Sequence, residues 1–229
     1  MTVYELAGYI DLSLLKPQAS KNEVEALIQD AQKYPFASVC IPPCYTGLAA
    51  KMLKEYPVKV GTVVGFPLGY QTTSVKLHEA REAVETGAEE IDMVMNISGF
   101  KSGELKMVQD EILEISSAIP QIVVKVIIET CYLTDEEKAT ACKLVIDGGG
   151  DFVKTSTGFG HSGATADDVR LLANTAAGRI KVKASGGIKN LNNTLKMIEA
   201  GANRIGTSAG VNIITEYRRQ RTEDRVKIF

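Results

Sequence analysis

The sequence contains no tryptophan, two histidines and four cysteines among its 229 residues. Two histidines, His78 and His161, do not suffice for a histidine-rich metal centre. No apolar run reaches the roughly 18 residues that a membrane-spanning helix needs. Lysine and arginine total 26 and aspartate and glutamate total 28, which gives a net charge of −2. This balance argues against a polybasic protein that binds nucleic acid or a membrane surface.

The first residues lack the features of a secretory signal, because residues 1–16 include Glu5 and Asp11 and have no basic leader. Without a leader, the four cysteines are expected to be reduced thiols, which predicts a cytoplasmic location. Two of them follow a C-x-x-x-C spacing, but no second pair of cysteines or histidines completes a zinc site. We therefore predict no metal and no cofactor. The cysteines are Cys40, Cys44, Cys131 and Cys142.

Short β-branched segments alternate with amphipathic helical segments along the whole chain. Several strand candidates are nearly continuous apolar runs, as expected for parallel strands that are covered by helices. Ser or Thr followed three residues later by an acidic residue, as at Ser20, Thr134 and Thr165, predicts capped helix starts. The strand candidates are residues 10–13, 37–41, 58–64, 89–95, 122–128, 151–154, 180–184 and 203–206.

Eight strand–helix units without a linker-like segment predict an α/β protein, a single (β/α)8 TIM barrel that forms one domain over residues 1–229. An open doubly wound sheet is the alternative. The regular spacing, with no long connection between units, favours the barrel.

Both architectures place active sites at the carboxyl ends of the strands. Lys154 ends one predicted strand and Lys183 ends the next. Adjacent strands lie about 4.8 Å apart, so two such ammonium groups would repel each other and lower the pKa of at least one. That effect favours an amine nucleophile at neutral pH, whereas two solvated strand-end charges are the alternative. Other strand-end residues are Asp11, Cys40, Asp92, Glu129 and Gly206.

Asp92 lies inside an otherwise apolar strand. A buried carboxylate is costly unless it is paired, so we expect a cationic partner at the mouth of the barrel. This pattern is compatible with a proton relay beside an amine and with a structural salt bridge.

Glycine-containing loops follow the seventh and eighth predicted strands, at Gly186 and Gly187 and at Gly206 and Ser208. In barrels these loops often bind phosphate through backbone N–H groups and a helix N-terminus. Lys189 adds a local positive charge to the first loop. Ordinary tight turns between strand and helix are the alternative.

Residues 158–163 match the pattern G-x-G-x-x-G, which is typical of dinucleotide-binding folds. That fold also needs an acidic residue about 20 residues further on, at the end of the next strand. The next predicted strand carries lysines there and no acid. The match therefore does not predict a nicotinamide or flavin dinucleotide cofactor.

Several segments together resemble the deoxyribose-phosphate aldolase family, whose members are class I aldolases on a (β/α)8 barrel. The match runs in order from about residue 9 to residue 215 and includes DFVKTSTGFG (151–160) and VKASGGIK (182–189). The resemblance implies that Lys154 forms a Schiff base, that Lys183 lowers its pKa, and that Asp92 relays protons. It also implies substrate or phosphate contacts from Cys40, Thr155, Gly158, Gly186, Gly187, Lys189, Gly206 and Ser208.

The implied reaction is reversible cleavage of 2-deoxy-D-ribose 5-phosphate to D-glyceraldehyde 3-phosphate and acetaldehyde. The binding partner would be a small phosphorylated sugar, and neither nucleic acid nor a membrane is expected. The resemblance is also compatible with a homo-oligomer (dimer or tetramer). A Schiff-base barrel that acts on another phosphorylated sugar is the nearest alternative. A non-catalytic phosphosugar-binding barrel would be expected to lack Lys154, Lys183 or Asp92.

The sequence departs from the family pattern at several positions. Leu12 and Ser13 stand where the family usually has His-Thr, and Pro42 stands where Asn is common. Longer members end with a tyrosine that helps proton exchange, whereas this chain ends in Phe229 and its last tyrosine is Tyr217.

Overall fold

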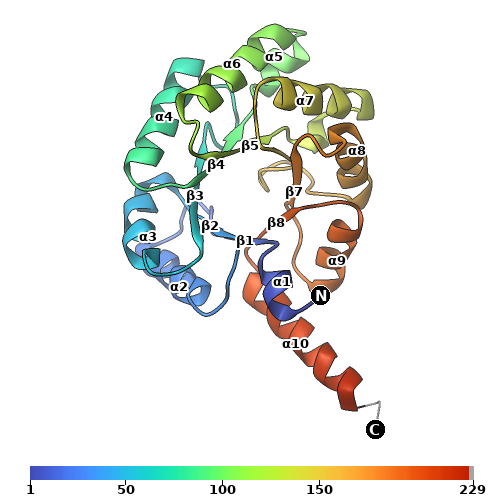
Figure 1. The fold of residues 1–229 in the computed structure, drawn as a ribbon. Helices are drawn as coiled ribbons and strands as arrows, with labels where there is room; N and C mark the ends of the chain where they lie inside the picture. The colour runs from blue at the N-terminus through green and yellow to red at the C-terminus, as the bar shows by residue number, and fades with distance from the viewer. Residues whose placement is uncertain (227–229) are drawn as a thin grey trace.

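A computed structural model describes residues 1–226 as a closed barrel of eight parallel strands with helices around it (Figure 1). The strands follow one another around the barrel in chain order, and β1 (Ile10–Ser13) pairs with both β2 (Ser38–Cys40) and β8 (Arg204–Thr207). The predicted TIM barrel is therefore confirmed, and the open sheet is excluded because the first strand pairs with the last, which closes the sheet. Residues 227–229, the end of the predicted domain, lie outside the described part.

All eight predicted strands are present, and each boundary falls within one residue of the prediction. The other strands are β3 (Lys59–Val64), β4 (Glu90–Val94), β5 (Val123–Ile127), β6 (Phe152–Lys154) and β7 (Lys181–Ser185). The helices are α1 (Val3–Ala7), α2 (Lys21–Ala31), η1 (Pro43–Tyr45), α3 (Thr46–Leu53), α4 (Thr73–Glu85), α5 (Ile97–Lys101), α6 (Leu105–Ala118), η2 (Thr130–Tyr132), α7 (Asp135–Asp147), α8 (Ala166–Ala176), α9 (Leu191–Glu199) and α10 (Gly210–Val226).

The predicted helix caps are present, with one difference. Ser20 and Thr134 form complete capping boxes at the starts of α2 and α7. Thr165 also caps α8 by accepting the Asp168 N–H, but the Asp168 carboxylate lies 2.6 Å from Lys138 instead of returning to the cap. The prediction of a reciprocal box at α8 was wrong because a cation on the neighbouring helix α7 competes for the acid.

The strands place apolar and charged side chains on opposite faces. Along β4, Ile91 and Met93 belong to the apolar core, whereas Glu90 and Asp92 pair with cations inside the barrel. This alternation follows from the two-residue period of a strand. The interior of this barrel therefore contains paired charges, where such barrels are usually filled by branched apolar side chains.

The N-terminus lies against α10, which runs outward from the barrel (Figure 1). The Tyr217 hydroxyl, on α10, donates a hydrogen bond to the Met1 carbonyl at 2.5 Å. The end of the tail, Lys227 to Phe229, lies outside the described residues. Within residues 1–226, none of the helices combines the length and the apolar character that crossing a membrane requires.

Candidate active site

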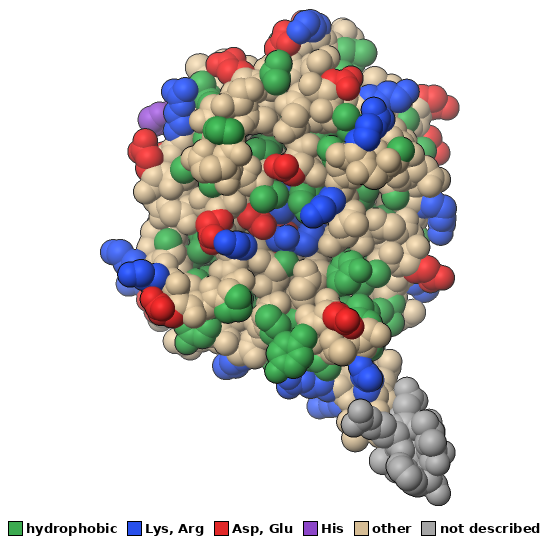
Figure 2. All heavy atoms as spheres, in the orientation of Figure 1, with side chains coloured by type: hydrophobic (Ala, Val, Ile, Leu, Met, Phe, Trp, Pro, Cys, Tyr) green, Lys and Arg blue, Asp and Glu red, His purple; other side chains and the backbone are tan. Residues whose placement is uncertain are grey.

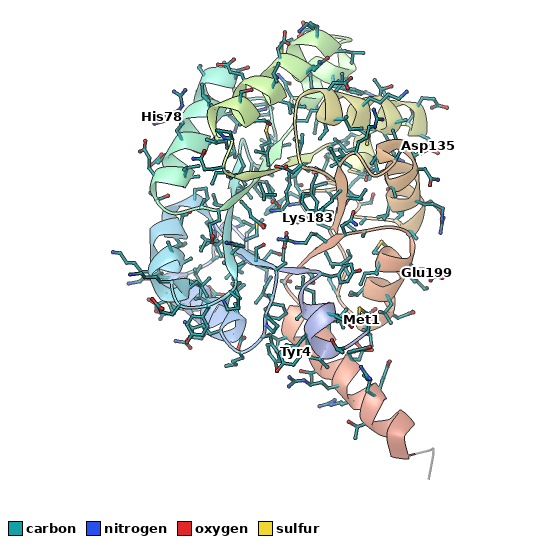
Figure 3. The ribbon with its side chains drawn as sticks, viewed as in Figure 1. Met1, Tyr4, His78, Asp135, Lys183 and Glu199 are labelled. Carbon is teal, nitrogen blue, oxygen red and sulfur yellow. The ribbon has the colours of Figure 1, made fainter. Side chains whose placement is uncertain are left out.

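The strand register brings the two predicted lysines together. Lys154, at the end of β6, is the direct partner of Lys183 on β7. Lys183 lies inside the ring of strands (Figure 3). Both side chains are buried, with 3% and 1% of their surface exposed, so they do not behave as solvated strand-end charges. That alternative is excluded by the geometry.

A single carboxylate oxygen contacts both lysines. Oδ2 of Asp92 lies 2.6 Å from Nζ of Lys154 and 2.6 Å from Nζ of Lys183. The other oxygen, Oδ1, accepts a hydrogen bond from Lys125 on β5 at 3.1 Å. The structure therefore gives Asp92 three cationic partners, where the sequence predicted one.

The two lysines experience opposite effects. Burial lowers the pKa of Lys154 below its ordinary value, and the charge of Lys183 lowers it further, against the attraction of Asp92. Burial also acts to lower the pKa of Lys183, but the carboxylates of Asp11 and Asp92 outweigh it and raise that pKa. Lys154 therefore loses its proton more readily than Lys183.

Asp92 stays ionised in this setting. Burial alone would raise its pKa, but Lys125, Lys154 and Lys183 hold the pKa well below the ordinary value. The carboxylate is therefore an anion at neutral pH that can accept a proton when a neighbouring lysine loses its charge.

Asp11 is a member of the site to which the sequence assigned no role beyond its place at a strand end. Its Oδ2 lies 2.5 Å from Nζ of Lys183, and its Oδ1 accepts a hydrogen bond from Arg204 at 2.6 Å. Burial opposes its ionisation, yet Lys183, Lys125 and Arg204 lower the pKa of Asp11 to about 2. Asp11 thus helps to keep Lys183 protonated.

Three further charged residues inside the barrel were also missed. Lys125 lies 2.6 Å from Glu90, and Arg204 lies 2.7 Å from the same carboxylate. Acidic and basic side chains lie close together at the centre of the face seen in Figure 2. The sequence contained a usable signal for two of them. Glu90 is two residues before Asp92 and therefore faces the same side of its strand, and Lys125 is a charged residue within an apolar strand.

A cavity of about 290 Å³ opens at the carboxyl ends of the strands. It contains nine of the predicted site residues: Cys40, Lys154, Gly158, Lys183, Gly186, Gly187, Lys189, Gly206 and Ser208. Residues that were not predicted also line it, among them Ser13, Lys16 and Thr157. Asp92 lies beneath the lysines. The loops after β7 and β8 therefore meet the two lysines around one cavity.

Thr155 is placed differently from the prediction. Its hydroxyl accepts a hydrogen bond from the Ser185 N–H at 3.1 Å and donates to the Ser185 carbonyl at 3.2 Å. The residue is fully buried and joins the end of β6 to the end of β7. The hydroxyl that lines the cavity belongs to Thr157, two residues further on, in the loop that follows β6.

The two glycines after β7 serve different purposes. Both have a positive φ, 85° at Gly186 and 78° at Gly187, which favours glycine. A Cβ at Gly186 would lie 2.9 Å from the Cα of Gly163, whereas a Cβ at Gly187 would have no atom within 4 Å. Gly186 is thus needed for packing, and Gly187 leaves its backbone open to the cavity.

Cys40 lies at the wall of the cavity, 3.8 Å from Oδ2 of Asp92. Burial and the charge of Asp92 raise the pKa of its thiol to about 11. The thiol is therefore neutral at physiological pH and contributes shape and a weak donor, since a thiolate would be needed for nucleophilic chemistry.

The structure also shows where the residues that depart from the family pattern lie. Leu12 is 2% exposed and packs in the apolar core between β1 and the helices, whereas Ser13 lines the cavity. Pro42 lines a neighbouring hollow of about 380 Å³ that shares Leu15 with the cavity. Of these three residues only Ser13 lines the cavity, and the lysines and Asp92 are in place.

The closed barrel, with buried lysines at the base of a cavity, defines an enzyme of the aldolase class. The model of the family described as "DeoC/LacD family aldolase" matches residues 8–216. The chain belongs to this family, and the family predicted from the sequence motifs is confirmed.

Curated relatives are similar over nearly their whole length. A deoxyribose-phosphate aldolase of Caldanaerobacter subterraneus subsp. tengcongensis is 54% identical over 222 residues, covering 96% of each chain. One from Carboxydothermus hydrogenoformans is 52% identical and covers 92% of this chain and 94% of its own. Among solved structures, the aldolase QR15 superposes with a TM-score of 0.91 at 46% identity, covering 95% of this chain and 97% of that one.

Proposed function

We propose that this chain cleaves 2-deoxy-D-ribose 5-phosphate reversibly to D-glyceraldehyde 3-phosphate and acetaldehyde, through a Schiff base on Lys154. The observation that carries the proposal is the placement of Lys154. It lies at the base of the cavity, buried between Asp92 and a protonated Lys183, where its pKa is lowered. An amine with a lowered pKa in a cavity is the form that attacks an aldehyde at neutral pH.

The first step is addition of the neutral Lys154 amine to the C1 aldehyde of the open-chain sugar. The carbinolamine loses water and gives an iminium, in which the nitrogen can accept an electron pair from the carbon chain. The adjacent Lys183 ammonium can donate a proton to the departing hydroxyl, since both amines meet at the same oxygen of Asp92.

The second step breaks the C2–C3 bond. Its electron pair moves to the iminium as an enamine, and the C3 hydroxyl loses its proton to become the aldehyde of glyceraldehyde 3-phosphate. Asp92, acting directly or through one water molecule, takes that proton and supplies one to the enamine carbon. Addition of water to the resulting iminium then releases acetaldehyde and frees Lys154.

The phosphate is bound in this proposal by the loops after β7 and β8. The open backbone at Gly187, the backbone at Gly206 and Ser208, and the exposed Lys189 side chain lie on the same side of the cavity wall. Lys16, from the loop after β1, adds a second exposed cation to the rim. N–H groups and cations together suit a phosphate dianion.

We also propose that the protein assembles with copies of itself and acts in a reducing, cytoplasmic compartment. A solved structure with 34% identity and a TM-score of 0.88, covering 95% of this chain, is described as a unique tetrameric deoxyribose phosphate aldolase from Aeropyrum pernix. The four cysteines of this chain are free, which suits a compartment that keeps thiols reduced. Light scattering of the purified protein measures the assembly directly.

Two measurements test the proposed reaction. Incubation with 2-deoxy-D-ribose 5-phosphate should release acetaldehyde, detected by reduction with an alcohol dehydrogenase and NADH. Incubation with acetaldehyde and borohydride should add about 28 Da, one ethyl group, to the peptide that contains Lys154, because the imine formed by an activated lysine is reduced to a stable amine. A preparation that releases no acetaldehyde from the sugar phosphate contradicts the proposal.

A further inference from the structure

Glu129, directly after β5, has an unusual backbone conformation. Its φ is 53° and its ψ is 69°, in the left-handed region that residues other than glycine rarely occupy. Such a conformation costs about 1 to 3 kcal/mol and persists where the surrounding structure requires it. The side chain is also buried, with 2% of the residue exposed. Contacts around Glu129 must therefore hold its backbone in this conformation.

The carboxylate holds the loop that follows Lys154. The Thr157 N–H lies 3.2 Å from both oxygens of Glu129, and the Thr157 hydroxyl donates to Oε2. The loop then passes over the carboxylate, because a Cβ at Gly160 would lie 3.2 Å from Cδ of Glu129. Thr157, Gly158 and Phe159 all line the cavity, so Glu129 positions a complete wall of it.

These contacts also fix the direction of the Thr157 hydroxyl. Its proton points to Glu129, and one lone pair accepts the Phe159 N–H at 3.0 Å. A hydroxyl has one proton and two lone pairs, so one acceptor position is left. A group that lines a cavity and offers a lone pair, with its own proton engaged, can bind a donor such as an alcohol.

We propose that Glu129 is a positioning residue that makes the Thr157 hydroxyl an obligatory hydrogen-bond acceptor for a hydroxyl group of the bound sugar. The inference rests on the proposed function, because it assigns a contact to that substrate. This hydrogen bond would contribute to substrate specificity. A deoxy sugar has a hydroxyl that can donate to Thr157, whereas acetaldehyde has none.

Glu129→Met removes both acceptor oxygens with little change in side-chain length. Glu129→Gln keeps one acceptor, because its Oε1 can take the position of Oε2 and accept both the hydroxyl and the N–H of Thr157. In Glu129→Met the Thr157 proton loses its partner and can turn to the sugar, where the native site offers a lone pair. Thr157→Val removes the hydroxyl, and Thr157→Ser keeps it.

Three substrates distinguish the Thr157 contact from the phosphate contacts and from the chemistry at Lys154. We expect Glu129→Met and Thr157→Val to raise KM about three- to tenfold for 2-deoxy-D-ribose 5-phosphate and for unphosphorylated 2-deoxy-D-ribose, the loss of one hydrogen bond. Borohydride trapping of acetaldehyde on Lys154 should keep its native rate in both variants. The double variant should be no worse than either single variant, because both remove the same contact.

Thr157→Ser and Glu129→Gln, which keep the hydroxyl and an acceptor for it, should have near-native kinetics. Glu136→Met, at an exposed glutamate of α7, is the matched control for the loss of a carboxylate. If acetaldehyde trapping falls in parallel with sugar cleavage, Glu129 only supports the loop and the inference is overturned. Native KM values for both sugars in Glu129→Met overturn it equally. Failure of the proposed function is distinguishable, since the unmodified protein would then not cleave the sugar phosphate at all.

Discussion

Two clusters of charge lie inside the barrel, and they differ in the carboxylates that each cation contacts. At the carboxyl ends of the strands, Lys154 and Lys183 meet at one oxygen of Asp92, and the other oxygen of Asp92 accepts a hydrogen bond from Lys125. Towards the other end, Lys125 and Arg204 contact two anions, and Glu90 lies within 2.7 Å of each cation. The second anion of that cluster is Asp11, which reaches across to Lys183 at 2.5 Å.

The count of charges decides what each lysine can do. Asp92, Asp11 and Glu90 together outweigh burial and raise the pKa of Lys125, and Asp11 and Glu90 raise the pKa of Arg204. Asp11 and Asp92 raise the pKa of Lys183. Lys183 contacts two carboxylates and Lys154 contacts one, so Lys154 is the lysine of this pair whose pKa is lowered.

A third buried lysine shows that a lowered pKa is not sufficient. Lys76, on α4, is fully buried and pairs with Glu111 at 2.7 Å, and burial lowers its pKa. Its Nζ also donates to the Val94 carbonyl at 2.9 Å, behind the barrel wall. Lys154 differs in lining a cavity that a substrate can enter.

The largest effect is expected at the cluster that contains Lys154 and Lys183. Lys154→Ala should abolish acetaldehyde trapping and lower kcat by at least roughly 10³-fold, as removal of a covalent nucleophile does. Lys183→Ala should still be trapped, at a lower rate, with the added mass on Lys154. Peptide mass spectrometry after borohydride reduction distinguishes the two. A label on Lys183, with Lys154→Ala still reactive, would reverse the assignment of nucleophile and neighbour.

The next effect concerns pH. Lys183→Met removes the positive neighbour and leaves Asp92 to Lys154, so both changes raise the pKa of Lys154. Because the neutral amine reacts, the rate rises with pH through this pKa, and the rising limb of kcat should move to higher pH by about one unit or more. Trapping rates measured across pH 6 to about 10 show the shift. A limb that stays in place would mean that burial alone tunes Lys154.

The sequence predicted the fold more completely than it predicted the site. The strands were predictable because each is an apolar run between turn residues, and Lys154, Lys183 and Asp92 because strand ends meet at one mouth. The partners of Asp11 could not be predicted, since they depend on which side chains cross the barrel interior. Thr155 and Thr157 illustrate the limit: the Thr155 hydroxyl donates to the Ser185 carbonyl and Thr157 lines the cavity, a difference that depends on the path of the backbone after β6.

A smaller effect is expected at the phosphate loop. Gly187→Val places a side chain in the open space beside the backbone, at a φ of 78° that disfavours valine. Cleavage of 2-deoxy-D-ribose 5-phosphate should lose about tenfold or more in kcat/KM, the equivalent of one or two contacts to the phosphate. Activity on 2-deoxy-D-ribose should change less. Gly178→Val, at an open positive-φ glycine that does not line the cavity, is the control for backbone strain. Equal losses on both sugars would remove the phosphate role from this loop.

The smallest effect on chemistry is expected at the other cluster, where Glu90→Gln removes an anion that Lys125 and Arg204 share. The cations then lack part of their compensation, so the free energy of unfolding should fall by about 1 to 3 kcal/mol, the cost of leaving a buried charge poorly paired. The kcat should stay within about threefold of the native value, because Lys154 keeps its own neighbours. Glu89→Gln, one residue earlier and in a half-exposed pair with Lys59, is the matched control and should cost at most about 1 kcal/mol. Urea unfolding and steady-state kinetics on the same preparations measure both quantities. If Glu90→Gln instead lowered kcat more than tenfold with stability unchanged, the two clusters would form one catalytic unit, and the difference between them would not explain their roles.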